Sequence, residues 1–286
     1  MYCSSDEQLR EKPCTTIIKE SRAQRQQKHE SPRFETKSSD VENEQLKVQN
    51  VMQMEFINIA AHELRTPIQP ILGISELLVS KVKDAEQLQL LNAIVRNAKR
   101  LERLTNDILD VARIETNSLN ITKELFNLSD VIVNVIEDMR TTNIHLCNNE
   151  RIVKLLYEPV DIFVNADKGR IIQVISNLLN NAVKFTTEGY VLIEVERKKD
   201  DKSNNDGQEK RFIVISVKDT GIGLDPEILP KLFSKFATKS HHSHTGVGVG
   251  LGLFISKNIV EAHGGKIWAE NNLDEKGVTF HVVLPA

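Results

Sequence analysis

The sequence predicts a two-part α plus α/β protein, with a helical hairpin over residues 46–118 and an α/β domain over residues 119–286. Between positions 91 and 112, apolar residues recur at alternating steps of three and four, which is the spacing of a helix that packs against other helices. After position 119, short β-branched runs alternate with helical patterns and turn residues. A length of 286 residues also suits about two domains.

Residues 1–45 are polar and contain few aliphatic side chains. Such a composition buries too little apolar surface to fold alone, so we expect a disordered lead-in. The segment is also shorter than a typical domain, and we expect no dedicated sensor module within it.

The first helix of the hairpin is expected over residues 46–79, where apolar residues recur at helical steps from Met52 onward. Pro67 and Pro70 should interrupt and bend this helix, because each removes a backbone donor. The polar residues 80–87 are expected to connect it to the second helix.

The second helix carries an apolar heptad seam for which a lone helix has no use. The seam consists of Leu91, Ile94, Ala98, Leu101, Thr105, Ile108 and Ala112. We therefore expect two copies of the hairpin to pair as a four-helix bundle, which makes the protein a homodimer.

The remaining elements are expected in an α/β order. They are a helix over 130–140 capped by Ser129, strands over 152–157 and 161–164, a helix over 167–185, strands over 190–196 and 212–218, a helix over 248–263, and strands over 266–270 and 278–284. The charged segment 198–210 is expected to be a hairpin tip.

The composition excludes several classes of protein. A net charge of −3 gives no reason to expect binding to nucleic acid or to a membrane surface. No apolar run approaches the ~20 residues of a membrane span, and no secretory signal is visible. Three cysteines without metal-ligand spacing favour a reducing cytoplasm.

His62 lies in the middle of the first helix, beside Glu63 and one turn before Thr66. A histidine is neutral for the most part at pH 7 and then has one free ring nitrogen, which can attack phosphorus. A neighbouring carboxylate such as that of Glu63 can orient the ring and accept its proton. Taken alone, the pair also fits an ordinary exposed histidine with a charged neighbour.

Asn177, Asn181 and Lys184 share one face of the helix expected over residues 167–185. Amide oxygens suit Mg²⁺, which keeps waters and shares phosphate oxygens, and a lysine meets phosphate as a point charge. Asparagines on a helix are usually solvated, but these interrupt an otherwise apolar helix.

Asp219 follows a strand and precedes Gly221 and Gly223. A carboxylate at a strand end can accept a hydrogen bond from an adenine amino group, and glycines allow the backbone to approach the base. Taken alone, the segment would be a simple turn.

A glycine run precedes the helix expected at residues 248–263. Its members are Gly246, Gly248, Gly250 and Gly252. Backbone donors at a helix start can bind phosphate, and the glycines allow a mobile lid. The spacing fits neither the Walker pattern nor the dinucleotide fingerprint.

Together and in this order, the four segments resemble the H, N, G1 and G2 boxes of sensor histidine kinases, and the resemblance covers residues 52–286. It implies a dimeric hairpin domain followed by a two-layer α/β sandwich of the Bergerat type, with ATP and Mg²⁺ as cofactors. It also implies that His62 is phosphorylated, that Glu63 is the base, and that Thr66 positions water for a phosphatase reaction.

For the nucleotide, the resemblance implies that Asn181 ligates Mg²⁺ with help from Asn177, and that Asp219 recognises adenine. It also implies transfer of the phosphoryl group to an aspartate on the receiver domain of a response regulator. The family's F box is similar to Leu232–Phe236, but Ala237 stands where the family often has an aromatic residue, and Val249 where it commonly has Thr.

Two other functions remain open from the sequence. A related ATPase, such as a DNA gyrase or MutL-type protein or a mitochondrial protein kinase, would share the nucleotide boxes but lack the His-Glu-x-x-Thr hairpin. A dimeric scaffold or pseudokinase would bind nucleotide without transferring phosphate.

Overall fold

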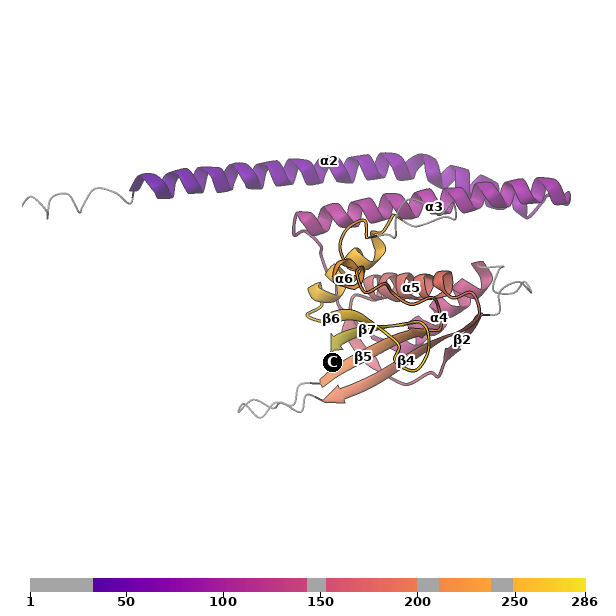
Figure 1. Ribbon diagram of the computed structural model, residues 1–286. Coiled ribbons are helices and arrows are strands. Elements are labelled where there is room, and N and C mark those ends of the chain that lie inside the picture. The colour runs from indigo at the N-terminus through magenta and orange to yellow at the C-terminus, as the bar shows by residue number, and fades with distance from the viewer. Residues whose placement is uncertain (1–32, 143–152, 200–210, 238–248) are drawn as a thin grey trace, which may run out of the picture. The chain divides into compact units, whose positions relative to one another are not determined.

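The computed structural model describes residues 33–142, 153–199, 211–237 and 249–286, and the chain divides into compact units at residues 1–55 and 56–286 (Figure 1). Helix α2 (Arg33–Val79) begins in the first unit. Residues 33–45 are helical, so the expected disorder is wrong for them, while residues 1–32 lie outside the described residues. Glu, Gln and Lys are good helix formers, and extending a helix costs less than starting one.

Helix α2 continues through Pro67 and Pro70 as one helix, so the expected interruption is wrong. Each proline removes a single N–H from the helix, and the flanking hydrogen bonds maintain it. Helix α3 (Ala85–Glu115) begins where the carboxylate of Asp84 accepts the N–H of Gln87, which shortens the connector.

The two helices are joined in antiparallel register by polar side chains. The guanidinium of Arg65 donates to Asn106 at 2.6 Å, and the amide of Gln69 donates to Glu102 at 2.6 Å. In this register His62 lies level with the residues about three positions beyond Asn106 on α3.

The expected heptad seam alternates between buried and exposed residues in a single chain. Its buried members are Ala98, Thr105 and Ala112, its exposed members are Ile94, Leu101 and Ile108, and Leu91 is half-buried. Helix α2 exposes further apolar side chains, namely Met52, Phe56, Ile59, Ile71, Ile74, Leu77 and Leu78. One chain therefore leaves a large apolar surface of the hairpin uncovered, as a bundle-forming hairpin should.

The rest of the second unit contains a five-stranded sheet in the order β2-β4-β5-β7-β6. Its strands are β2 (Val153–Tyr157), β4 (Gly189–Lys199), β5 (Arg211–Asp219), β6 (Lys266–Asn271) and β7 (Val278–Pro285). β2 pairs with β4 in parallel, and the other neighbours are antiparallel. The expected hairpin tip between β4 and β5 falls largely on residues outside the described ranges.

Helices α4 (Leu128–Thr142), α5 (Lys168–Phe185) and α6 (Gly252–Ala262) lie on one face of this sheet (Figure 1). Buried residues of these helices and of the strands form one apolar core. A two-stranded sheet of β1 (Glu124–Asn127) and β3 (Phe163–Ala166) adjoins it. The expected two-layer sandwich is confirmed.

Ser129 does not cap α4, which begins one residue earlier. Its hydroxyl instead accepts the N–H of Val160 and contacts the hydroxyl of Tyr157. The amide oxygen of Asn127 accepts the N–H of Ser129. Within the described part of the chain, no helix is both long enough and apolar enough to cross a membrane.

Candidate active site

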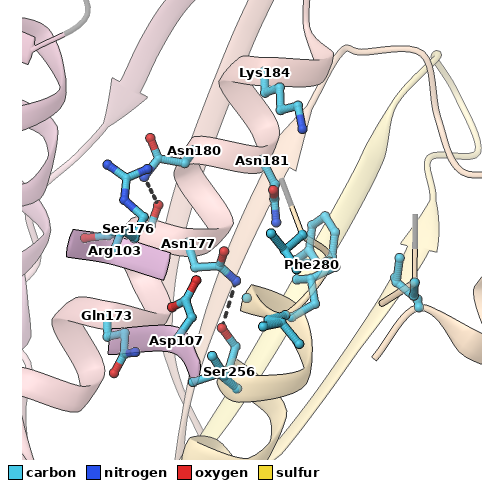
Figure 2. Close-up of a pocket in the computed structure, with 18 of the residues that line it drawn as sticks. Arg103, Asp107, Gln173, Ser176, Asn177, Asn180, Asn181, Lys184, Ser256 and Phe280 are labelled. Carbon is cyan, nitrogen blue, oxygen red and sulfur yellow. Dashed lines mark hydrogen bonds between the residues drawn. The ribbon is translucent and has the colours of Figure 1, made fainter. Parts of the chain in front are cut away.

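A cleft of about 1230 Å³ lies among α3, α5, the end of β5 and the start of α6 (Figure 2). It is lined by predicted site residues from three segments: Asn177, Asn181, Lys184, Asp219, Gly223, Gly250 and Gly252. The structure thus brings together groups that lie up to 75 positions apart in the chain (252 − 177 = 75).

Helix α5 presents its polar face to this cleft, and its start is capped by a side chain. The carboxylate of Asp167 accepts the N–H of Arg170 in the first turn. Although partial burial raises the pKa of Asp167, hydrogen bonds from two backbone N–H groups lower it overall. The opposite face of α5 carries buried residues such as Leu178 and Leu179.

Asn181 and Lys184 extend from α5 into the cleft (Figure 2). Asn181 makes no hydrogen bond to the described residues, so its amide oxygen is available to a ligand. Partial burial lowers the pKa of the Lys184 ammonium, which lies 4.9 Å from the centre of the Phe185 ring. A cation and a hard oxygen ligand one turn apart are suited to a metal-bound phosphate.

Asp219 lies at the end of β5 and is only 3% exposed. Burial raises the pKa of its carboxyl, and hydrogen bonds from the N–H groups of Gly221 (2.8 Å) and Val278 (3.3 Å) partly oppose that rise. Both bonds go to Oδ1, so among the described residues no donor reaches Oδ2. A fixed carboxylate with a free oxygen can recognise an amino group.

The glycines beside Asp219 are required by their surroundings. A Cβ at Gly221 would lie 2.5 Å from the carbonyl oxygen of Phe185. Gly223 has a φ of 80°, which residues other than glycine rarely adopt. The backbone therefore follows the cleft wall closely at this point.

At the start of α6, no side chain caps the helix. Gly250 has a φ of 76°. The N–H groups at this uncapped start are suited to phosphate. Gly246 and Gly248 lie outside the described residues, as does most of the expected lid.

The F-box residues divide between core and surface. Phe233 packs against the apolar core, whereas Phe236 is exposed and has a φ of 60°. Residues 238–248, which follow this segment, lie outside the described ranges.

His62, Glu63 and Thr66 lie on the surface of α2, and none of them lines the cleft. The side chain of His62 is 75% exposed, and its Nδ1 lies 3.7 Å from Oε1 of Glu63. The hydroxyl of Thr66 donates to the carbonyl oxygen of His62 at 2.7 Å. Arg65, on the same turns of α2, does reach the cleft.

An ion pair joins α3 to α5 at one end of the cleft, and the sequence reasoning missed it. Arg170 donates to both carboxylate oxygens of Asp110 at 2.8 Å, and Gln173 donates to one of them at 2.7 Å. Burial, and then the charge of Asp110, raise the pKa of Asp107 to about 6. A signal in the sequence was the pair of carboxylates, Asp107 and Asp110, that lie three residues apart beside the seam.

Two family models match the chain. Residues 52–117 match the His Kinase A (phospho-acceptor) domain, and residues 166–286 match the histidine kinase-, DNA gyrase B- and HSP90-like ATPase. The chain belongs to the sensor histidine kinases. The phospho-acceptor match distinguishes this histidine kinase from ATPases that share only its nucleotide domain.

Curated relatives agree with this assignment. The autoinducer 2 sensor kinase/phosphatase LuxQ of Vibrio vulnificus is 34% identical over 236 residues, which cover 81% of this chain and 26% of LuxQ. Hybrid signal transduction histidine kinase C of Dictyostelium discoideum is 32% identical over 244 residues, which cover 83% of this chain and 19% of that protein. The chain thus spans about a quarter of the length of LuxQ and about a fifth of the length of hybrid kinase C.

Solved structures share the fold. Full-length ShkA in complex with AMPPNP has a TM-score of 0.59 and 28% identity, over 81% of this histidine kinase and 45% of ShkA. Histidine kinase AdeS of Acinetobacter baumannii has a TM-score of 0.50 and 23% identity, over 78% of this chain and 97% of that one. The second likeness concerns the fold alone.

Proposed function

We propose that this histidine kinase transfers the γ-phosphoryl group of ATP to His62 and then to an aspartate on a separate response regulator. The observation that supports the proposal is the combination of a polar cleft suited to a nucleotide with an exposed histidine on the neighbouring helical hairpin. Both features are in one chain, and each corresponds to one half of the reaction.

In the nucleotide half, the free Oδ2 of Asp219 accepts a hydrogen bond from the adenine amino group. The ammonium of Lys184 and the N–H groups at the start of α6 bind phosphate oxygens. Asn181 is the proposed protein ligand of Mg²⁺, which when bound neutralises phosphate charge and orients the leaving group.

In the acceptor half, the neutral imidazole of His62 attacks the γ-phosphorus through Nε2. The bond between that phosphorus and the bridging oxygen of ADP breaks, and ADP leaves. Glu63 lies beside Nδ1, so it orients the ring and accepts the Nδ1 proton as the P–N bond forms.

The chemistry requires that the two halves meet, and His62 does not line the cleft in this structure. Transfer therefore requires that the hairpin and the nucleotide domain change their relative position. Whether a chain phosphorylates its own histidine or that of its partner depends on how the connector at residues 80–87 turns.

Further parts of the proposal rest on the hairpin and on the family. The uncovered apolar residues of α2 and α3 pair with those of a second copy in a homodimer. Thr66 positions water for dephosphorylation of the regulator; the relative LuxQ is named a sensor kinase/phosphatase. Such a reaction takes place in the cytoplasm, where ATP is available.

The test is labelling with γ-³²P-ATP and Mg²⁺ of the wild type and of a His62→Gln variant. We expect label on the wild type that is lost in acid and retained in base, and none on the variant. A scaffold or pseudokinase predicts that neither protein is labelled although ATP binds. Equal labelling of both proteins would remove His62 from its proposed role.

A further inference from the structure

Asn177 was expected to help ligate Mg²⁺, but its side-chain amide is already engaged within the protein. Its Nδ2 donates to the hydroxyl of Ser256 at 2.9 Å, across 79 positions of the chain (Figure 2). Ser256 lies on α6 and is 1% exposed. A buried hydroxyl of this kind is held in one place, so it fixes the orientation of the amide that binds it.

The oxygen end of the same amide packs against the start of α6. A Cβ added to Gly252 would lie 2.2 Å from Oδ1 of Asn177 and 2.8 Å from its Cγ. Only glycine therefore leaves room for the amide at this position. No side chain caps the start of α6. The contact with Asn177 therefore restrains the first turn of α6.

These contacts link the two phosphate-facing elements of the cleft. Asn177 is one helical turn from Asn181 on α5, and Gly252 ends the glycine run that opens α6. Asn177, Gly252 and Ser256 all line the cleft. We propose that Ser256 is a positioning residue for nucleotide binding, which acts by holding the Asn177 amide against Gly252 so that α5 and the start of α6 keep the spacing that phosphate requires.

This inference rests on the proposed nucleotide site and assigns Asn177 a structural link in place of a metal ligand. The two roles differ in their dependence on Mg²⁺. A link between α5 and α6 shapes the site whether or not metal is present, whereas a metal ligand matters only when the metal is bound. Asn181, which makes no hydrogen bond to the described residues, provides the contrast.

The experiment measures the affinity of the full chain for ATP by calorimetry, in Mg²⁺ and in EDTA. Variants are Ser256→Ala, Ser256→Cys (which keeps the volume), Asn177→Ala and the Asn177→Ala/Ser256→Ala double substitution. We expect each to weaken binding by about fivefold to tenfold, the net effect of one hydrogen bond, and to the same extent in both buffers. The double variant should be no weaker than the single ones, because both remove the same link.

Two controls separate positioning from general loss of stability. Ser129→Ala removes another buried, hydrogen-bonded serine that lies outside the cleft, and we expect a lower unfolding temperature with unchanged ATP affinity. Asn181→Ala should weaken binding in Mg²⁺ and leave binding in EDTA nearly unchanged.

Several results would overturn the proposal: wild-type affinity in both Ser256 variants, multiplicative losses in the double variant, or a loss confined to the Mg²⁺ buffer. If the wild type itself binds no ATP, the proposed function fails along with the inference. If the wild type binds ATP and the Ser256 variants match it, the inference fails alone.

Discussion

His62 and Asp219, at the two ends of the proposed transfer, lie in opposite surroundings. The His62 side chain is 75% exposed, and Glu63 lies beside its ring. Asp219 is 3% exposed, accepts two backbone N–H groups, and is followed by Gly221 and Gly223, where a side chain would meet the Phe185 carbonyl or a strained φ. A group that recognises a ligand gains from a fixed position, whereas an acceptor that must be reached by a donor, and later by a second protein, has to remain accessible.

Among variants that keep His62, the largest effect is expected at the nucleotide site. Asn181→Ala removes the proposed Mg²⁺ ligand, so labelling of His62 should fall by about 100-fold or more, since metal neutralises the charge that moves with the phosphoryl group. Initial labelling rates over a range of Mg²⁺ concentrations measure this. Asn180→Ala is the matched control, because Asn180 bonds to the Ser176 carbonyl of its own helix and points away from Asn181 (Figure 2). Full activity in Asn181→Ala would contradict the metal assignment.

The next variant disrupts the proposed dimer interface of the hairpin that carries His62. Leu101 is 50% exposed in one chain and belongs to the uncovered part of the seam. Leu101→Lys would place two unpaired charges in a symmetric apolar interface, so dimer affinity should fall by about 100-fold. Sedimentation across a concentration series measures the change, and Leu125→Lys, at an exposed leucine of β1, is the control. An unchanged dimer would show that the seam does not form the interface.

A smaller effect is expected where α3 contacts α5. Burial and the Asp110 charge raise the pKa of Asp107 to about 6. The folded protein therefore holds this proton more tightly than the unfolded chain, and stability is lost as the pH rises from about 4 through 6. Asp107→Asn should raise the unfolding temperature by about 2–4 °C at pH 8 and by much less at pH 4.5. The expected rise at pH 8 is modest because Asp107 is partly exposed. The same gain at both pH values would rule out this titration.

The smallest effect on the kinase step is expected at Thr66. Its hydroxyl already donates to the carbonyl of His62 and lies outside the cleft. Thr66→Ala should leave autophosphorylation within about twofold and slow dephosphorylation of the regulator by about tenfold or more, while Thr66→Ser keeps both. Rates of ³²P loss from purified phosphorylated regulator measure the second reaction. A large loss of autophosphorylation in Thr66→Ala would mean that Thr66 acts in the kinase step, contrary to the proposal.

Features with a short-range physical cause could be predicted from the sequence. The spacing of Asn177, Asn181 and Lys184 placed them on one face of α5, and the helix was expected to begin at Asp167. Alternating apolar residues identified the strands of the main sheet. Strand β1 was missed because it has only four residues and depends on pairing with β3.

Contacts between distant segments could not be predicted. Asp110 and Arg170 are 60 positions apart, and Asn177 and Ser256 are 79 apart. Neither pair leaves a periodic signal, because each depends on how helices pack once the core has formed. Ser129 shows the same limit: its hydroxyl was expected to cap its own helix but bonds to a segment that folding brings beside it.

The most direct test of the account is to locate the phosphoryl group. The protein would be incubated with ATP and Mg²⁺, kept at alkaline pH, digested, and sequenced by tandem mass spectrometry, with ³¹P NMR of the intact protein to identify the bond. The account predicts a single phosphoramidate on His62. Phosphate on a serine, threonine or different histidine, or none on a protein that binds ATP, would contradict it.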